Sequence, residues 1–361
     1  MNCQRDTLAA RLRPAALVRL ALSLALIASL AAVRGAAACG PFGNPPAKVI
    51  AGIKPDCGHG EMLGPWRDAD GVSRYACLYE PATANRDDKL PMVVFLHPSL
   101  FPAGTVVTTG LLELGKEFQL GSDPNHPGFI VLAPEGRKTS HYYPAPDHNG
   151  IGWDNWYRQV NPVGDVTVAG VTYRENVDAA AIDHFVAREI ATGKVDTSRI
   201  YMTGWSNGAA MAILYGLNRH NIAAIAVYSA PNPFGAFDDP CTQTPVAGVP
   251  ANDGQIRIFN PGVPTMHVHN ACDLAGICPN GEEMAGELRT AGVEVRDAIV
   301  NSDGEPTGVC ARYCGTAPMG ESWWRDPLGY SLGLYHHLRW PIGWTAAMLE
   351  FMRTHPLKPA R

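Results

Sequence analysis

The sequence predicts an α/β fold in which helices cover both faces of a mostly parallel central sheet. From residue 92 onward, short apolar runs alternate with amphipathic stretches, which is the pattern that successive βαβ units produce. No repeat period of about 20 to 50 residues recurs, which excludes a solenoid or propeller. The runs that we expect to form strands are Met92–Leu96, Phe129–Ala133, Ile200–Thr203, Ala223–Tyr228, Thr265–His269 and Val293–Ile299.

The expected helices lie between those strands. In Glu175–Ile190, Val177, Ile182 and Phe185 recur at helical spacing, while Asp178 and Asp183 fall on other faces. The other segments that fit helices are Asn207–Asn218, Glu282–Thr290 and Trp344–Thr354. The stretch from Pro134 to Gly170 is rich in Gly, Pro, Asn and aromatic residues, which is typical of loops on the substrate side of such a sheet.

The first 38 residues have the composition of an export signal. Four arginines precede an apolar run from Leu20 to Val33, and Ala36–Ala38 offers small residues for cleavage. This run has 14 residues, whereas a membrane-spanning helix needs about 20. We therefore expect a secreted protein in which residues 39–361 form a single catalytic domain, with lipid attachment at Cys39 as the alternative.

Charge and cysteine content narrow the classes of partner and compartment. Removal of residues 1–38 takes away five Arg and one Asp, which leaves 24 basic and 33 acidic residues and a net charge of −9. Such a surface does not attract nucleic acid or anionic membranes.

Eight cysteines remain, and an even number in an exported chain favours disulfides. Proximity in the sequence favours the pair Cys310–Cys314, together with Cys57–Cys77 or Cys272–Cys278. The chain has no pair of cysteines at the C-x-x-C spacing of zinc ribbons, so we expect no metal site.

The strongest chemical motif is Gly204-Trp205-Ser206-Asn207-Gly208. An apolar strand precedes it and a small-residue helix follows it, which is the strand, sharp turn and helix of a nucleophile elbow. Glycines suit the flanking positions because the turn is strained and its neighbours approach closely. The motif therefore predicts that Ser206 is a nucleophile.

A serine hydroxyl needs a base, and the base needs a carboxylate, in the chain order Ser, acid, His. Asp273 follows the expected strand Thr265–His269 and is the predicted acid, with Glu282 or Glu283 as alternatives. The base is His336 or His337. We favour His336, which closes a G-x-x-H stretch, so that His337 would be a packing neighbour.

Two backbone N–H groups should stabilise the negatively charged oxygen of the reaction intermediate. One should belong to Asn207, directly after the nucleophile. The other should follow the strand Met92–Leu96, where Pro98 has no N–H group, so Ser99 is the expected donor.

With these residues in place, the chain from about Tyr75 to Phe351 resembles the extracellular polyhydroxybutyrate depolymerase and feruloyl esterase family of α/β hydrolases. The resemblance depends on the stretches VVFLHPS (93–99), VDTSRIYMTGWSNGAAMA (195–212) and HNACD ending at Asp273, and on the His336-His337 segment before Trp340-Pro341. It implies an α/β-hydrolase fold, a triad of Ser206, Asp273 and a histidine, and ester hydrolysis without a cofactor. Here His97-Pro98 stands where the family usually has His-Gly.

The resemblance implies ester substrates of two kinds, hydroxyalkanoate oligomers or polyesters and feruloyl-type esters. No linker and second compact module follow the catalytic region, which favours soluble oligomers or small esters over solid polymer. Aromatic residues could stack on a feruloyl ring or line an apolar acyl slot. The candidates are Trp153, Trp156, Tyr157 and Trp205. The alternatives are a secreted serine peptidase or amidase on the same fold, and a catalytically inactive binding protein.

Overall fold

A computed structural model gives the fold of this chain from residue 49 to residue 358. The residues left undescribed within that range are 70, 86, 122, 124, 140–141, 144, 147–149, 154–165, 169–170, 174–175, 235–257, 275–276 and 312–326. The predicted export signal and Cys39 therefore lie outside the described residues.

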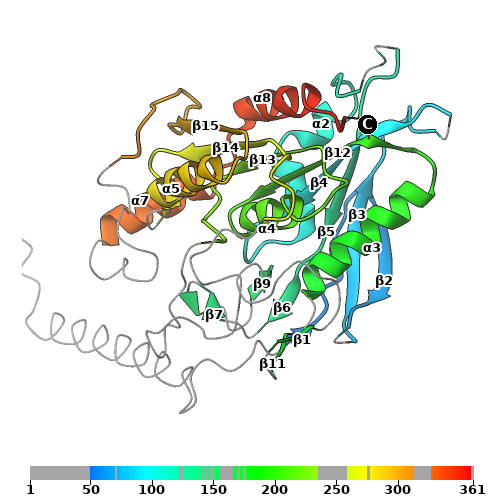
Figure 1. Cartoon of the computed structure of the whole chain (residues 1–361), viewed down its shortest axis with the longest axis horizontal. Coiled ribbons are helices and arrows are strands. Elements are labelled where there is room, and N and C mark those ends of the chain that lie inside the picture. The colour runs from blue at the N-terminus through cyan, green and yellow to red at the C-terminus, as the bar shows by residue number, and fades with distance from the viewer. Residues whose placement is uncertain are drawn as a thin grey trace, which may run out of the picture.

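The centre of the molecule is an eight-stranded sheet in the order β15-β14-β13-β12-β4-β5-β3-β2 (Figure 1). The six strands from β15 to β5 pair in parallel, whereas β3 pairs antiparallel with both β5 and β2. The strands are β2 (Glu61–Arg67), β3 (Ser73–Tyr79), β4 (Leu90–Leu96), β5 (Ile130–Pro134), β12 (Val195–Trp205), β13 (Ala224–Tyr228), β14 (Thr265–Asn270) and β15 (Val295–Val300).

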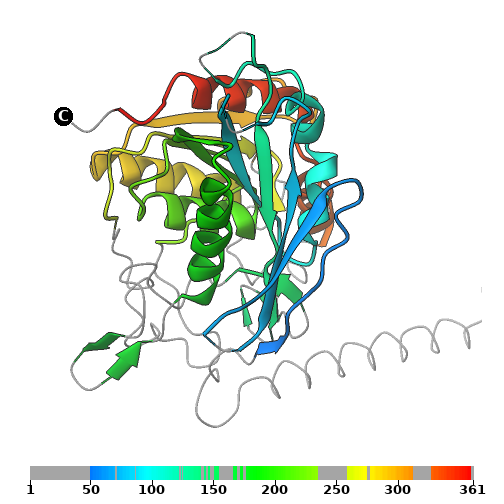
Figure 2. The ribbon, with the colours of Figure 1, turned by 90° about the vertical axis from the view of Figure 1, so that its right-hand side faces the viewer.

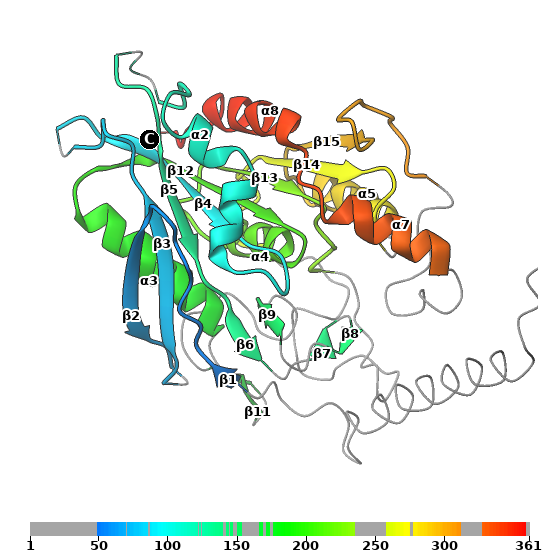
Figure 3. The ribbon, with the colours of Figure 1, turned by 180° about the vertical axis from the view of Figure 1, so that it is seen from behind.

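Helices cover both faces of this sheet, as the sequence predicts. Figures 1 and 2 show α3 (Val177–Ala191), α4 (Asn207–Gly216) and α5 (Ile277–Thr290) on one face and α8 (Ile342–Arg353) on the other. Seen from behind in Figure 3, η1 (Ala103–Thr108) and α2 (Leu111–Leu114) lie on the same face as α8, and α7 (Pro327–His337) lies at the end of the sheet near β14. Short strands form three small sheets: β1 (Val49–Ala51), β6 (Arg137–Thr139) and β9 (Gly150–Gly152); β7 (Tyr142–Tyr143) and β8 (Ala145–Pro146); and β10 (Val166–Val168) and β11 (Val171–Tyr173).

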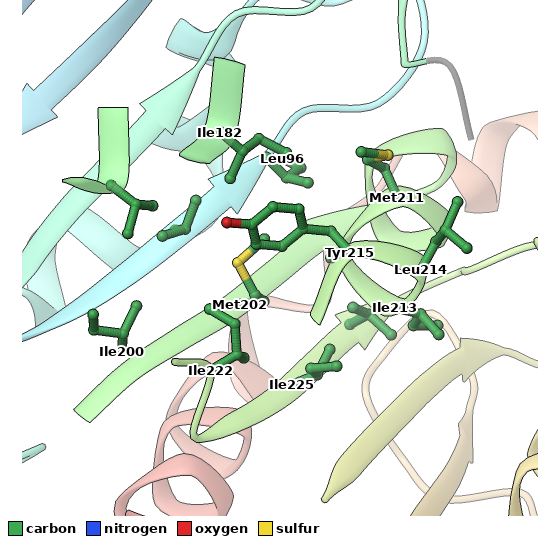
Figure 4. Close-up of a cluster of buried hydrophobic side chains, with 14 of the residues drawn as sticks. Leu96, Ile182, Ile200, Met202, Met211, Ile213, Leu214, Tyr215, Ile222 and Ile225 are labelled. Atoms are coloured by element: carbon green, nitrogen blue, oxygen red, sulfur yellow. The ribbon is translucent and has the colours of Figure 1, made fainter. Parts of the chain in front are cut away.

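The central strands are buried on both faces, so they read as continuous apolar runs. In β4, Met92 and Val94 pack in the cluster under α3, α4 and α5, whereas Val93 and Phe95 pack in the cluster under α2 and α8. Figure 4 shows part of the first cluster, where Met202 and Ile225 of the sheet lie beside Tyr215 of α4. Side-chain alternation along each strand therefore builds two cores on one sheet.

All six strands expected from the sequence are present within a few residues of their predicted bounds, and so are the four expected helices. Among the longer elements, β2, β3 and α7 were not predicted from the sequence. Gly64 and Pro65 within β2 are typical of a turn, and pairing with β3 overrides that local signal. Asp178, which the pattern places away from the apolar face of α3, is also buried, for a reason given below.

The disulfides agree with the predicted pairing at one position. Cys57 is bonded to Cys77, as expected. Cys278 is bonded to Cys310, so the predicted pairs Cys310–Cys314 and Cys272–Cys278 are wrong. Proximity in the sequence misled because the start of α5 and the segment after β15 meet only in the folded chain. Cys272 is also disulfide-bonded, and Cys241 and Cys314 lie outside the described residues.

In the part of the chain that the structure describes, no helix combines the length and the apolar character that a membrane crossing requires. The same residues contain no group of three or more His, Cys, Asp or Glu side chains arranged to hold a metal ion.

Candidate active site

Ser206 occupies a strained turn between β12 and α4. Its backbone has φ 56° and ψ −122°, a conformation that a non-glycine residue rarely adopts. A Cβ on Gly204 would lie 2.5 Å from the Gly208 carbonyl oxygen, and a Cβ on Gly208 would lie 2.2 Å from the Leu96 carbonyl oxygen. Both glycines of the motif are therefore required by close backbone contacts, which confirms the predicted elbow geometry.

A continuous chain of hydrogen bonds connects Ser206 to Asp273 through His337. Nε2 of His337 lies 2.8 Å from Oγ of Ser206, and Nδ1 of His337 lies 2.7 Å from Oδ1 of Asp273. Asp273 and His337 are buried, whereas Ser206 is partly exposed. The opposite nitrogens of one imidazole thus contact the hydroxyl and the carboxylate, which is the geometry that nucleophilic catalysis by serine requires.

The expectation that His336 makes these contacts is wrong. His336 bonds through Nδ1 to the hydroxyl of Ser302 in the loop after β15. The two histidines lie at the end of α7, where successive side chains diverge by about 100° around the helix axis. Gly333 precedes His337 by one helical turn on the same face, but only the folded chain shows that this face lies against Asp273.

Gly333 and two aromatic side chains fix the position of α7. A Cβ on Gly333 would lie 2.6 Å from the Asp273 carbonyl oxygen, so glycine allows the helix to rest against the loop that carries the acid. The last carbonyl groups of a helix accept no hydrogen bond from an N–H group of the same helix. Here Trp205 Nε1 donates to the His337 carbonyl at 2.9 Å, and Tyr228 Oη donates to the His336 carbonyl at 3.3 Å.

The carboxylate of Asp273 receives hydrogen bonds on both oxygens. Oδ1 accepts from the Leu274 amide at 2.6 Å in addition to His337, and Oδ2 accepts from Oγ of Ser229 at 2.6 Å. Ser229 directly follows β13 and is fully buried. The sequence analysis did not identify Ser229, because nothing along the chain connects it to a residue 44 positions away.

The predicted oxyanion residues lie close to each other. Asn207 is the first residue of α4, and N–H groups in the first turn of a helix point out of its N-terminus, where negative charge is stabilised. A Cβ on Gly152 would stand 3.3 Å from Oδ1 of Asn207 and 3.8 Å from Oγ of Ser99. Gly152 thus leaves space between these two residues, and both lie at the carboxyl ends of adjacent strands β4 and β12.

The turn that carries Ser99 is fixed by His97. Nε2 of His97 accepts a hydrogen bond from the Gly136 amide at 2.8 Å, so Nδ1 carries the proton and donates to the Pro98 carbonyl at 2.9 Å. Burial is the largest cause that lowers the pKa of His97 to about 4. The ring is therefore neutral near pH 7, as this hydrogen-bond pattern requires. Leu100, which follows Ser99, has a backbone φ of 71° and an exposed side chain.

Trp153 and Trp205 hold the site together from inside, which corrects the expectation that their rings contact substrate. They are only 5% and 4% exposed. Trp153 donates its amide to Oδ1 of Asn207 and its indole N–H to the His97 carbonyl. Trp205 packs under α7 as described above. Trp156 and Tyr157 lie outside the described residues.

A cluster of buried charges adjoins this turn. Arg74 of β3 lies 2.6 Å from Asp178 of α3 and 3.2 Å from Asp68, and Arg137 lies 3.5 Å from Asp68. Arg74 also donates to the backbone carbonyl of Glu135. The cluster joins β3, α3 and the segment after β5, and it explains why Asp178 is buried.

The side chain of Glu135 supports the start of η1. Its Oε2 accepts a hydrogen bond from the Ala103 amide at 2.6 Å, four residues after Ser99. Burial raises the pKa of Glu135 to about 8, although this hydrogen bond and Arg74 act in the opposite direction.

No protein-family model matches this chain, and neither does any curated protein. The solved structures to which the chain is similar include three esterases. The chain is 13% identical to the thermophilic esterase Est2 of the Planctomycetes species Thermogutta terrifontis with propionate bound, covering 84% of this chain and 98% of that chain with a TM-score of 0.48. It is 18% identical to acetyl xylan esterase from Aspergillus awamori, covering 65% and 80% with a TM-score of 0.41. A thermostable esterase is 17% identical with a TM-score of 0.40, and the similarity covers 82% of this chain and 62% of that one.

Because these identities and TM-scores are low, the assignment of the fold depends on the strand order and residues of this chain. Its mostly parallel sheet is covered on both faces and carries a strained Ser206 after β12 and a carboxylate after β14. A histidine follows β15, the last strand of that sheet. This order of elements and residues is that of an α/β-hydrolase fold.

Proposed function

We propose that this protein is a serine esterase that hydrolyses carboxylic esters through an acyl-enzyme. The observation that carries the proposal is the imidazole of His337, which bonds to Oγ of Ser206 with one nitrogen and to Asp273 with the other. The strained backbone of Ser206 adds support, because strained residues cluster at active sites, where the surrounding structure enforces their conformation.

In the proposed reaction, Oγ of Ser206 attacks the ester carbonyl carbon while Nε2 of His337 accepts the hydroxyl proton. The carboxylate of Asp273 stabilises the positive charge that forms on the ring. The amides of Ser99 and Asn207 donate to the oxyanion. The ester C–O bond then breaks, and the alcohol leaves with the proton from His337. A water molecule, activated by the same histidine, releases the carboxylic acid and restores Ser206.

Apolar side chains beside these groups favour an ester with an apolar portion. Leu100 and Phe101 directly follow Ser99 and are 65% and 38% exposed, and Phe101 stacks on Trp205 at 6.5 Å. Hydroxyalkanoate oligomers, polyesters and feruloyl-type esters all have such portions, and we propose them as the substrate classes. No cofactor takes part in the proposed chemistry.

We also propose that the protein is exported and that residues 39–361 form one catalytic domain. The disulfides Cys57–Cys77 and Cys278–Cys310 are compatible with an oxidising compartment. The apolar run after the N-terminal arginines gives independent support.

The test compares wild-type protein with Ser206→Ala on short p-nitrophenyl esters, hydroxybutyrate oligomers, methyl ferulate and matched amides. We expect ester turnover by the wild type and a loss of about 10³-fold or more in the variant. A serine-directed phosphonate should label only the wild type, and equal circular dichroism spectra control for folding. Faster cleavage of amides than of esters would favour the peptidase or amidase alternative, and full activity of Ser206→Ala would overturn the proposal.

A further inference from the structure

The environment of Ser229 is unusual for a serine. It directly follows β13, at the same sheet edge as Ser206 and Asp273, and it is completely buried. Its backbone has φ 52°, in the left-handed region that favours glycine. Its amide donates to the Val268 carbonyl of β14 at 2.9 Å, which fixes this conformation against the strand that precedes Asp273.

The side chain of Ser229 accounts for the choice of residue at this strained position. A glycine would adopt the same backbone with less strain, but it could not bond to a carboxylate. Oγ of Ser229 lies 2.6 Å from Oδ2 of Asp273, the oxygen that His337 does not contact. A buried carboxylate oxygen without a donor is strongly unfavourable, and hydrogen bonds to charged groups are among the stronger ones.

We propose that Ser229 is a positioning residue of the active site, which fixes the carboxylate of Asp273 so that Oδ1 faces His337. This inference rests on the proposed function. With Leu274 on Oδ1 and Ser229 on Oδ2, rotation of the carboxylate about its Cβ–Cγ bond would break at least one hydrogen bond. The same contact holds the ends of β13 and β14 together at the point where the acid leaves the sheet.

The test uses Ser229→Ala and Ser229→Gly in the full chain, with Ser206→Ala as the inactive reference. Both Ser229 variants should lower kcat by about tenfold to a hundredfold, the loss expected for one hydrogen bond to a charged group. KM should stay within about twofold, because Ser229 does not face the substrate. Labelling of Ser206 by a phosphonate should slow in proportion to kcat.

Comparing the two variants separates positioning from mere stability. Ser229→Gly removes the side chain and also relieves the left-handed strain, so it should melt at a higher temperature than Ser229→Ala while showing the same loss of kcat. As a matched control, Thr265→Val removes another fully buried hydroxyl, which bonds to His267 at the opposite end of β14. It should lower the melting temperature and leave kcat unchanged.

Two outcomes would overturn the inference. One is wild-type kcat in both Ser229 variants while Ser206→Ala is inactive, which leaves the proposed function intact. The other is a decrease in kcat that is proportional to the decrease in melting temperature across Ser229→Ala, Ser229→Gly and Thr265→Val. Full activity of Ser206→Ala would instead remove the proposed function, and the role of Ser229 with it.

Discussion

Two buried aspartates in this protein have nearly the same exposure and very different partners. Asp273 is 2% exposed and accepts hydrogen bonds from an imidazole, an amide and a hydroxyl. Asp178 is 1% exposed and lies 2.6 Å from the guanidinium group of Arg74. A carboxylate beside a permanent cation is already neutralised, so its contribution is to hold elements together. A carboxylate beside an imidazole stabilises the positive charge that forms when that ring accepts a proton.

Under the proposed function, the partner of each carboxylate, and not its degree of burial, separates the catalytic role of Asp273 from the structural role of Asp178. The two sites are also connected, since Arg74 bonds to Glu135, and Glu135 bonds to the start of η1 after Ser99. Changes at the Asp273 site should therefore mainly affect turnover, and changes at the Arg74 site should mainly affect stability.

The largest expected effect separates the two adjacent histidines. His337→Ala should lower kcat by about 10³-fold or more, because it removes the only ring that contacts both Ser206 and Asp273 among the residues described. His336→Ala should keep kcat within about tenfold of wild type, since the ring that it removes bonds to Ser302 and packs on Tyr335. Steady-state kinetics on a p-nitrophenyl ester measures both. An inactive His336→Ala beside an active His337→Ala would refute the assignment of the base.

At the other site, Arg74→Met should destabilise the fold by about 3–5 kcal/mol, because it leaves Asp68 and Asp178 buried with less compensating charge. Urea denaturation gives the free energy of unfolding, and kcat per folded molecule should change little. The control is Arg188→Met on the exposed side of α3, where two distant ion pairs of 3.7 and 3.9 Å should contribute less than about 1 kcal/mol. Equal losses in the two variants would contradict the structural role of the cluster.

A smaller effect is expected when α7 is displaced from the acid loop. Gly333→Ala would place a Cβ 2.6 Å from the Asp273 carbonyl oxygen, so the helix has to shift and carry His337 with it. Since small misplacements of catalytic groups are costly, we expect kcat to fall by about tenfold or more. Gly343→Ala in α8 is the matched control, because its Cβ would meet nothing within 4 Å and alanine favours the helix. If Gly333→Ala is as active as Gly343→Ala, the close contact does not position the base.

The smallest expected effect is a pH dependence of stability that comes from three buried titratable groups, His97, Glu135 and His267. Burial lowers the pKa of His97 to about 4 and of His267 to about 3, from 6.5, so their contribution to stability is lost as pH falls below about 6.5. Burial raises the pKa of Glu135 from 4.5 to about 8, so its contribution is lost as pH rises towards 8. Each group contributes a slope of up to about 1.4 kcal/mol per pH unit.

These three groups together place maximal stability near pH 6.5. Denaturant unfolding at pH 5.5, 6.5 and 7.5 should show this maximum in the wild type. Glu135→Gln, which stays neutral at every pH and can still accept from the Ala103 amide, should lose the decline between pH 6.5 and 7.5. An unchanged decline in that variant would show that another group titrates there.

The parallel sheet, its two covering layers and the elbow at Ser206 could all be predicted from the sequence. These features depend on contacts that are local in the chain or on side-chain periodicity, as in the alternation along β4 and the Gly-x-Ser-x-Gly spacing. The sequence also predicted Asp273 as the acid, and the structure has this residue after the end of β14 and in contact with His337. The antiparallel strands β2 and β3 were not predicted, and in β2 the residues Gly64 and Pro65 interrupt the strand pattern.

The folded chain was needed to show which histidine meets Ser206, which cysteines pair, and that Trp153 and Trp205 are buried beneath the site. Each of these depends on the approach of segments far apart in the sequence. His337 is 131 positions from Ser206, Cys278 is 32 from Cys310, and Trp153 is 56 from His97. The physical reason is that the direction of a side chain at the end of a helix is set by what the helix packs against. For α7, that surface is the Asp273 loop, which contacts Gly333 and leaves only the face of His337 turned towards the elbow.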